Sequence, residues 1–203
     1  WDAEAGAEAG PPDAPALAAL RAALTRNPRR YGFHATLKAP FRLAEGVGPA
    51  DLDGAVAALA AAQPVARGPA LRVDAGLGFA ALRPSGAAPE IDRLAAACVT
   101  ALDGLRAPVT EAELARRRRG GLDAAAEAHL LRWGYPFVFD LFRFHMTLTE
   151  RLIEEQAAGI APALADLFAP TLSDPFEIAE IAVFGDPGAG APFRLLRRYP
   201  LGG

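Results

Sequence analysis

Two nearly identical pentads contain two of the three histidines in this sequence. Phe33 to Leu37 reads FHATL, and Phe144 to Leu148 reads FHMTL. In an extended strand, alternate side chains point to the same face, so each histidine shares a face with the threonine two positions later. The phenylalanine, the central residue and the leucine then occupy the opposite face. Each pentad therefore predicts a strand with an apolar face for packing and a His/Thr face for chemistry.

The same alternation adds a cation to each histidine face. Counting by twos from His34 reaches Lys38, and counting from His145 reaches Arg143 in one direction and Thr149 in the other. Imidazoles, hydroxyls, an ammonium and a guanidinium, with no carboxylate among them, suit an anionic group better than a divalent metal. We therefore predict a phosphate-binding face that uses no metal and no cofactor.

Two histidines on such a face could act as a proton donor and a proton acceptor. Histidine suits both roles near neutral pH because its ordinary pKa is about 6.5. Cleavage of a phosphodiester needs a base at the attacking oxygen, an acid at the departing oxygen and donors around the developing charge. We expect the two rings to titrate as a coupled pair, and the sequence leaves open which ring has which role.

Apolar periodicity predicts the elements that position the first pentad. The expected order is a helix over 15–26, a strand over 31–43 that carries the pentad, a helix over 49–62, and short strands over 70–75 and 78–83.

The second half is predicted in the same way. The expected order is a helix over 90–105, a polar connector over 106–121, a helix over 122–133, the pentad strand over 137–149, a helical region over 154–168 that Pro162 interrupts, and strands over 176–184 and 193–199. The glycines of 185–190 predict a hairpin turn, because no Gly-Lys-Ser/Thr or strand-to-helix context for a phosphate-binding loop follows them.

The shared order of helix, pentad strand, helix and strand pair predicts an internal duplication. We expect an α+β fold in one bilobal domain, with lobes of about 1–77 and 78–203 and with terminal strands that cross between the lobes. Each lobe would be an antiparallel sheet flanked by helices, and the two would face a central cleft. In the second half a strand and a helix precede the shared unit, so we also expect an N-terminal strand that lies outside this sequence.

The composition of the sequence limits which partners and which cell compartment we expect for this protein. The net charge of −3 and sequence pI near 5.7 argue against general nucleic-acid binding, which needs a basic excess. The single cysteine, Cys98, excludes an internal disulfide and is compatible with a reducing compartment. Because no apolar run is long enough to span a bilayer, we expect a cytoplasmic protein whose partner is a small phosphorylated substrate. The sequence does not predict an oligomeric state.

The two His-x-Thr elements resemble those of the two-histidine phosphoesterase superfamily. The wider strings RYGFHATLKAPFRL (Arg30 to Leu43) and WGYPFVFDLFRFHMTLTE (Trp133 to Glu150) are similar to one branch, a bacterial family of phosphonate-metabolism proteins. The resemblance implies a bilobal α+β fold with both motifs in the cleft. It also implies that the catalytic pair is His34 and His145 and that the phosphate-binding hydroxyls are those of Thr36 and Thr147. Lys38 and Arg143 rest on strand alternation alone.

Together these features predict a phosphoric diester hydrolase, a metal-independent phosphodiesterase or cyclic phosphodiesterase that acts on a small nucleotide-like or phosphosugar substrate. Two alternatives stay open, a cyclic phosphodiesterase acting on RNA ends and a protein that binds nucleotides or phosphosugars without turnover. The basic run Arg116 to Arg119 is either a phosphate clamp or a helix face paired with Glu113. His129 lies in a helical pattern and is not assigned to the site.

Overall fold

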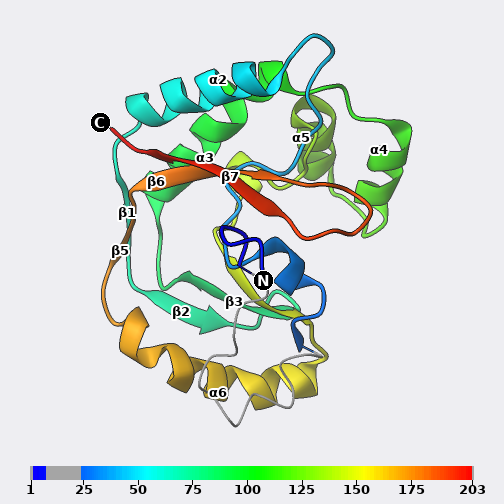
Figure 1. The fold of residues 1–203 in the computed structure, drawn as a ribbon. Coiled ribbons are helices and arrows are strands. Elements are labelled where there is room, and N and C mark those ends of the chain that lie inside the picture. Colours follow the sequence, from blue (N-terminus) through cyan, green and yellow to red (C-terminus); the bar gives the residue numbers. More distant parts are fainter. Residues whose placement is uncertain (1, 8–23, 203) are drawn as a thin grey trace.

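The computed structural model describes residues 2–7 and 24–202, and over these residues the fold is α+β (Figure 1). The α-helices are α2 (Pro49–Ala62), α3 (Pro89–Ala101), α4 (Glu111–Arg118), α5 (Ala124–Trp133) and α6 (Glu154–Leu172). Short 3-10 helices are η1 (Pro28–Tyr31), η2 (Asp103–Leu105) and η3 (Phe139–Leu141). The strands are β1 (Ala66–Gly68), β2 (Leu71–Asp74), β3 (Phe79–Pro84), β4 (Met146–Arg151), β5 (Phe176–Ile178), β6 (Glu180–Gly185) and β7 (Arg194–Pro200).

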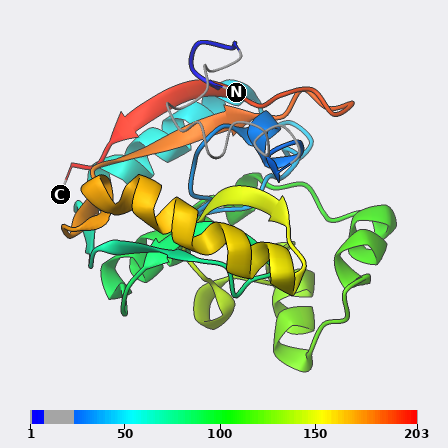
Figure 2. The ribbon, with the colours of Figure 1, turned by 90° about the horizontal axis from the view of Figure 1, so that it is seen from below.

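These strands form three small antiparallel sheets. One has the order β2-β3-β4, and the other two are the pairs β1-β5 and β6-β7. Helix α6 runs beneath the three-stranded sheet and packs on β2 and β3, as Figures 1 and 2 show from two directions. On the other side of the molecule α2 packs against β7 and α3.

Two apolar clusters hold these layers together. The larger joins α2, α3, β1, β6 and β7 to the second pentad, whose Phe144 is buried. The smaller lies between α6 and the three-stranded sheet and contains Ala80, Ile160 and Leu164. The helices over 49–62, 90–105 and 122–133 were predicted from stripes of apolar residues, and their buried side chains confirm those stripes.

The first pentad is not in a regular strand, so the strand predicted over 31–43 is wrong. This segment makes only two isolated antiparallel bridges, Ala35 to Met146 and Leu43 to Arg106. Bends at Leu37 and Lys38 and the missing N–H of Pro40 interrupt the pairing between them. The exposed Phe33 corrects the expectation that both phenylalanines are core residues, since its side chain is 60% exposed whereas that of Phe144 is 6% exposed.

Helix α6 continues through Pro162, where the sequence predicted an interruption. Proline removes the hydrogen bond to the carbonyl four residues earlier, which here belongs to the exposed Ala158 and is accessible to water. Burial of Ile160 and Leu164 on both sides of Pro162 fixes the helix on the sheet.

The connector predicted over 106–121 contains the helix α4. Thr110 and Glu113 form a capping box, in which the Glu113 N–H donates to Thr110 Oγ1 (3.2 Å) and the Thr110 N–H donates to Glu113 Oε2 (2.8 Å). A threonine followed by glutamate three positions later is a sequence signal for a helix start, so this helix was predictable.

The predicted arrangement of two sheets is also corrected, because three occur. The boundary predicted between residues 77 and 78 falls in the turn of the β2-β3 hairpin, and β1 pairs with β5 across that boundary. Most of the helix predicted over 15–26 lies outside the described residues. No helix in the part of the chain that the structure describes is long and apolar enough to cross a membrane.

Candidate functional site

The two pentads lie side by side although they are far apart in the sequence. Ala35 forms an antiparallel bridge with Met146, and Met146 also pairs with Leu82 of β3. Both bridging side chains pack against the larger apolar cluster. Because neighbours along an extended chain face the opposite way, the residues on either side of the bridge turn away from that cluster. These residues are His34, Thr36, His145 and Thr147.

The antiparallel register also sets which of these residues face each other. With Ala35 opposite Met146, His34 lies opposite Thr147 and Thr36 lies opposite His145. Each histidine therefore faces the threonine of the other pentad.

Both histidines make the same hydrogen bond to the backbone. His34 Nδ1 lies 3.1 Å from the Gly32 carbonyl, and His145 Nδ1 lies 2.8 Å from the Arg143 carbonyl. A carbonyl oxygen can only accept, so each ring donates from Nδ1 and, when neutral, has its lone pair on Nε2. Gly32 has a φ of 70°, a region that favours glycine, and it follows η1 directly.

The two Nε2 atoms have different surroundings. His34 Nε2 lies 3.0 Å from Thr36 Oγ1 and accepts a hydrogen bond from that hydroxyl. His145 Nε2 has no hydrogen-bond partner among the described residues, and its ring lies 5.6 Å from the Phe79 ring between centroids. Burial lowers the pKa of His34 below its ordinary 6.5, and repulsion from His145 lowers it further against the opposing effect of the Gly32 carbonyl. His34 is thus held as a neutral acceptor.

A cavity of about 220 Å³ opens beside His34 and Thr147, and we call it the histidine cavity. Its wall consists of Asn27, Pro28, Tyr31, Gly32 and His34 from the first segment, Phe79 from β3, and Thr147, Thr149 and Arg151 from β4. Among the residues that the structure describes, no carboxylate belongs to this wall. The three β4 residues alternate along the strand, so one face of β4 forms one side of the cavity.

The two threonines of β4 in this wall are not equivalent. The buried Thr149 hydroxyl accepts the Ala80 N–H at 2.9 Å and donates to the Glu150 carbonyl at 2.8 Å. The β3-β4 pairing is irregular between Phe79 and Ala81, and the Thr149 hydroxyl supplies hydrogen-bond partners to the backbone groups there. The Thr147 hydroxyl has no partner among the described residues and is available to a ligand.

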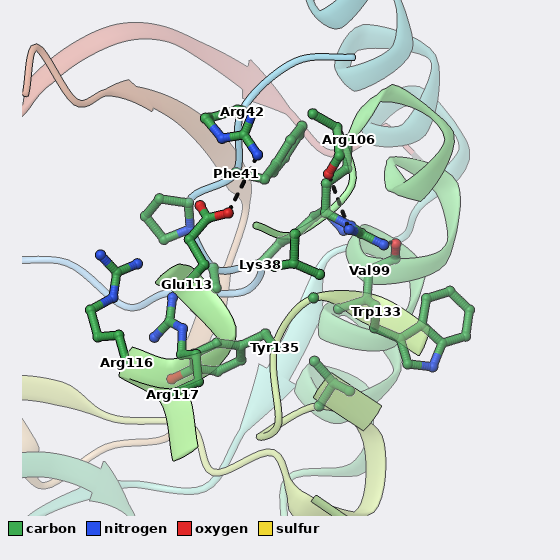
Figure 3. Close-up of a pocket in the computed structure, with 16 residues that line it drawn as sticks. Lys38, Phe41, Arg42, Val99, Arg106, Glu113, Arg116, Arg117, Trp133 and Tyr135 are labelled. Carbon is green, nitrogen blue, oxygen red and sulfur yellow. Dashed lines mark hydrogen bonds and ion pairs between the residues drawn. The ribbon is translucent and has the colours of Figure 1, made fainter. Parts of the chain in front are cut away.

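The structure does not bring Lys38 to this cavity. Its ammonium donates to the Val99 carbonyl at 3.2 Å and lies 3.8 Å from Asp103 Oδ1, and its side chain is only 8% exposed. Figure 3 shows it in a second, smaller cavity of about 30 Å³, with Arg106 and Trp133. Strand alternation fails here because the extended pairing ends after Ala35 and the chain bends at Leu37 and Lys38.

Arg143 is also turned away from the cavity. Its guanidinium donates to the carbonyls of Asp140 and Phe142, both at 2.7 Å, and its side chain is exposed. Strand β4 begins only at Met146, so alternation does not extend back to Arg143.

The run Arg116 to Arg119 is separate from the histidine cavity. Arg116 and Arg117 line the small cavity of Figure 3, where Arg117 lies over the Tyr135 ring at 4.6 Å. Arg118 pairs with Glu127 at 2.5 Å. Glu113 pairs with Arg42 at 3.3 Å, so the expected pairing of Glu113 with Arg116 and Arg117 is replaced.

Sequence reasoning missed three polar side chains of the wall, Asn27, Tyr31 and Arg151. Arg151 was within reach, because counting by twos from Thr149 leads to it. Asn27 and Tyr31 had no such signal, since their position depends on η1 and on the pairing of the Phe193 N–H with the Arg30 carbonyl (2.8 Å). His129 lies outside the cavity and its Nε2 is 2.8 Å from Asp140 Oδ1.

Metal ligands do not gather in this region. Across residues 2–7 and 24–202 there is no group of three or more histidine, cysteine, aspartate or glutamate residues placed to hold a metal ion.

Two curated proteins are similar to most of this chain. One, from Janthinobacterium sp. (strain Marseille), is 44% identical over 188 residues, which are 91% of this chain and 42% of the relative. The other, from Laribacter hongkongensis (strain HLHK9), is 40% identical over 168 residues, which are 83% of this chain and 38% of the relative. Both are named ribose 1,5-bisphosphate phosphokinase PhnN. The chain therefore spans about two fifths of the length of these relatives.

These names overturn the predicted activity. A kinase transfers a phosphoryl group to an acceptor, whereas we predicted a hydrolase of phosphodiesters, with an RNA-end enzyme as an alternative. The prediction was wrong because histidines and hydroxyls that can hold phosphate do not by themselves define what happens to it. A family model matches residues 36–194, which include Thr36 and the whole second pentad. The chain belongs to the family described as Protein of unknown function (DUF1045).

Proposed function

We propose that this chain binds the phosphorylated ribose acceptor in a phosphoryl-transfer reaction of the kind for which its two relatives are named. One observation carries the proposal. The wall of the histidine cavity joins His34 to the opposing Thr147, and among the described residues it has an unused Thr147 hydroxyl and no carboxylate. The chain resembles two proteins named ribose 1,5-bisphosphate phosphokinase over most of its length, and the family model covers the cavity residues of β3 and β4.

The chemistry of the wall supports a sugar phosphate as the ligand. Thr147 can donate to a phosphate oxygen, and the neutral His34 can accept a hydrogen bond from a ribose hydroxyl or a protonated phosphate oxygen. In phosphoryl transfer, protein groups chiefly position the reactants and receive the acceptor's proton. We assign that proton to His34 Nε2, which is unprotonated and would exchange its hydrogen bond from the Thr36 hydroxyl for one from the substrate.

The acceptor is favoured over the nucleotide because of what the chain offers to nucleotide phosphates. In the P-loop, a lysine that follows glycine reaches the β- and γ-phosphates. The only lysine of this sequence, Lys38, follows leucine and donates to the Val99 carbonyl. We therefore assign the acceptor to this chain and leave the nucleotide to other parts of such a protein.

We also infer that the chain contains an internal duplication. The order helix, strand, strand, strand follows each pentad, as α2-β1-β2-β3 and as α6-β5-β6-β7. The corresponding strands β1 and β5 pair with each other, and β2-β3 and β6-β7 are both antiparallel pairs. This symmetry supports a common origin with two-histidine proteins, and the resemblance of the two wider strings supports a role in phosphonate metabolism.

Calorimetric titration of the intact chain with ribose 1,5-bisphosphate tests the proposal. We expect binding, and we expect His34→Ala and Thr147→Val each to weaken it about ten-fold or more, since a hydrogen bond to a charged group contributes about 1.5–3 kcal/mol. His129→Ala is the matched control, because it removes a histidine that lies outside the cavity.

Two results would overturn the assignment. One is the absence of binding, or binding that neither cavity variant changes. The other is displacement of the bound sugar by ATP, which would make the cavity a nucleotide site.

A further inference from the structure

Arg151 is an arginine of the histidine cavity whose charge is not neutralised. It is the last residue of β4, it is exposed, and it lines the cavity with Thr147. Its guanidinium has no ion pair or hydrogen bond among the described residues. The adjacent Glu150 does not form an ion pair with Arg151; its Oε1 accepts the Asn27 N–H at 2.9 Å instead.

The backbone of Arg151 is nevertheless fixed. Arg151 pairs with Phe79 in the β3-β4 ladder, and the next N–H along the chain, of Leu152, donates to the Gly78 carbonyl at 2.8 Å. The Arg151 side chain extends over this turn, since a Cβ built on Gly78 would lie 3.6 Å from Arg151 Nη1. The sheet therefore fixes the backbone of Arg151 at one end of the cavity.

Arg151 and Thr147 define two ends of one wall. They are four residues apart on the same strand face, which at a rise of about 3.3 Å per residue separates their Cα atoms by about 13 Å. A single phosphate cannot fill such a distance, whereas a pentose with a phosphate at each end has two anionic groups to place along it. No carboxylate of the wall opposes a second phosphate near Arg151.

We propose that Arg151 binds the second phosphate of a bisphosphorylated pentose and so selects bisphosphorylated over monophosphorylated sugars. This inference rests on the proposed function, which places the first phosphate at Thr147 and His34. Arginine suits the role because its planar guanidinium forms two parallel hydrogen bonds with phosphate and stays charged at every physiological pH.

The test compares two ligands on the intact chain by calorimetry, ribose 1,5-bisphosphate and ribose 5-phosphate. In Arg151→Gln we expect affinity for the bisphosphate to fall about ten-fold or more, since a charge-assisted pair is lost, while affinity for the monophosphate stays the same. Arg151→Lys should recover part of the loss, because lysine restores the charge without the planar fork. Thr147→Val should weaken both ligands by the same factor.

The matched control is Arg93→Gln, which removes an exposed arginine of α3 that does not line the cavity. An Arg151→Gln protein that keeps the wild-type ratio of the two affinities overturns the role of Arg151 and leaves the proposed function intact. Failure of the wild-type chain to bind either sugar overturns both.

Discussion

His34 is kept uncharged by its position between the first segment and the β6-β7 pair. Its ring lies 5.7 Å from the Phe184 ring and 6.4 Å from the Tyr31 ring, between centroids. Burial in this aromatic setting is the main reason why its pKa lies below 6.5. A lowered pKa keeps Nε2 unprotonated at neutral pH, as the proposed role of proton acceptor requires.

The same shift predicts how stability depends on pH. As pH falls past 6.5, the unfolded chain binds a proton at this position more readily than the folded protein does. Stability rises with pH wherever the unfolded state binds more protons, so His34 lowers the free energy of unfolding as pH falls from about 7 towards 5 and has no such effect well above 7. We expect His34→Gln to flatten urea-unfolding free energies over this range.

His129→Gln is the control for this measurement, because it leaves His34 in place. Identical pH profiles for the wild type and His34→Gln would contradict the shift. A proton titration of His34 followed by NMR gives its pKa directly and is expected to fall below 6.5.

At the residue scale, sequence alternation was reliable only where a strand exists. It correctly grouped Thr147 with Thr149 because both lie in β4, and one more step would have added Arg151. It failed for Lys38 and Arg143, which lie beyond the ends of extended pairing. Lys38 lies 3.8 Å from the half-buried Asp103, which is distant in the sequence, and no local pattern indicates this pairing.

At the scale of elements, helix α6 contains an interior proline, and the packing of the helix on the sheet offsets the cost of that proline. Pro162 is exposed in the middle of this helix, whereas Pro170 lies near its end. Alanine is favoured over proline in a helix interior by about 3 kcal/mol. We expect Pro162→Ala to raise the free energy of unfolding by roughly 1–3 kcal/mol, measured by urea denaturation.

Pro170→Ala is the matched control and should raise stability less, because the last turn of a helix contributes fewer bonds and frays. An unchanged or lower stability in Pro162→Ala would mean that the alanine helix loses a contact that proline makes with its surroundings.

The predictability of the elements follows from where their stabilisation arises. Helices such as α2 and α3 were predicted because the apolar residues that they bury recur at helical spacing within their own sequence. The three-residue strand β1 was missed because its pairing partner, β5, lies more than a hundred residues later. The first pentad was misassigned for the same kind of reason, since its sequence favours a strand but only one bridge ties it to β4.

At the scale of the whole molecule, the pair β1-β5 joins regions that are distant in the sequence. Gly68 of β1 pairs with Phe176 of β5, and a Cβ on Gly68 would lie 2.7 Å from Phe176 Cε1 and 2.8 Å from Ile91 Cδ1. Both distances are too short for non-bonded carbon atoms, so even one added methyl group must displace the side chains of Phe176 and Ile91. We expect Gly68→Ala to lower the free energy of unfolding by roughly 1–3 kcal/mol, as overpacking commonly does.

Gly104→Ala is a suitable control, because a Cβ there meets nothing within 4 Å. Thermal unfolding of the two variants should differ clearly. Equal stability would show that the β1-β5 pair accommodates the added methyl group without a loss of unfolding free energy.

The single bridge between Ala35 and Met146 gives the cavity a property that continuous strands would not have. One wall can separate from the other by breaking this bridge and the hydrogen bond from the Asn27 N–H to Glu150 Oε1, while the β2-β3-β4 sheet stays intact. A ligand held by His34 and Thr147 together binds the closed arrangement and stabilises it by mass action. We expect local opening at this bridge to accompany the entry and release of the proposed sugar phosphate.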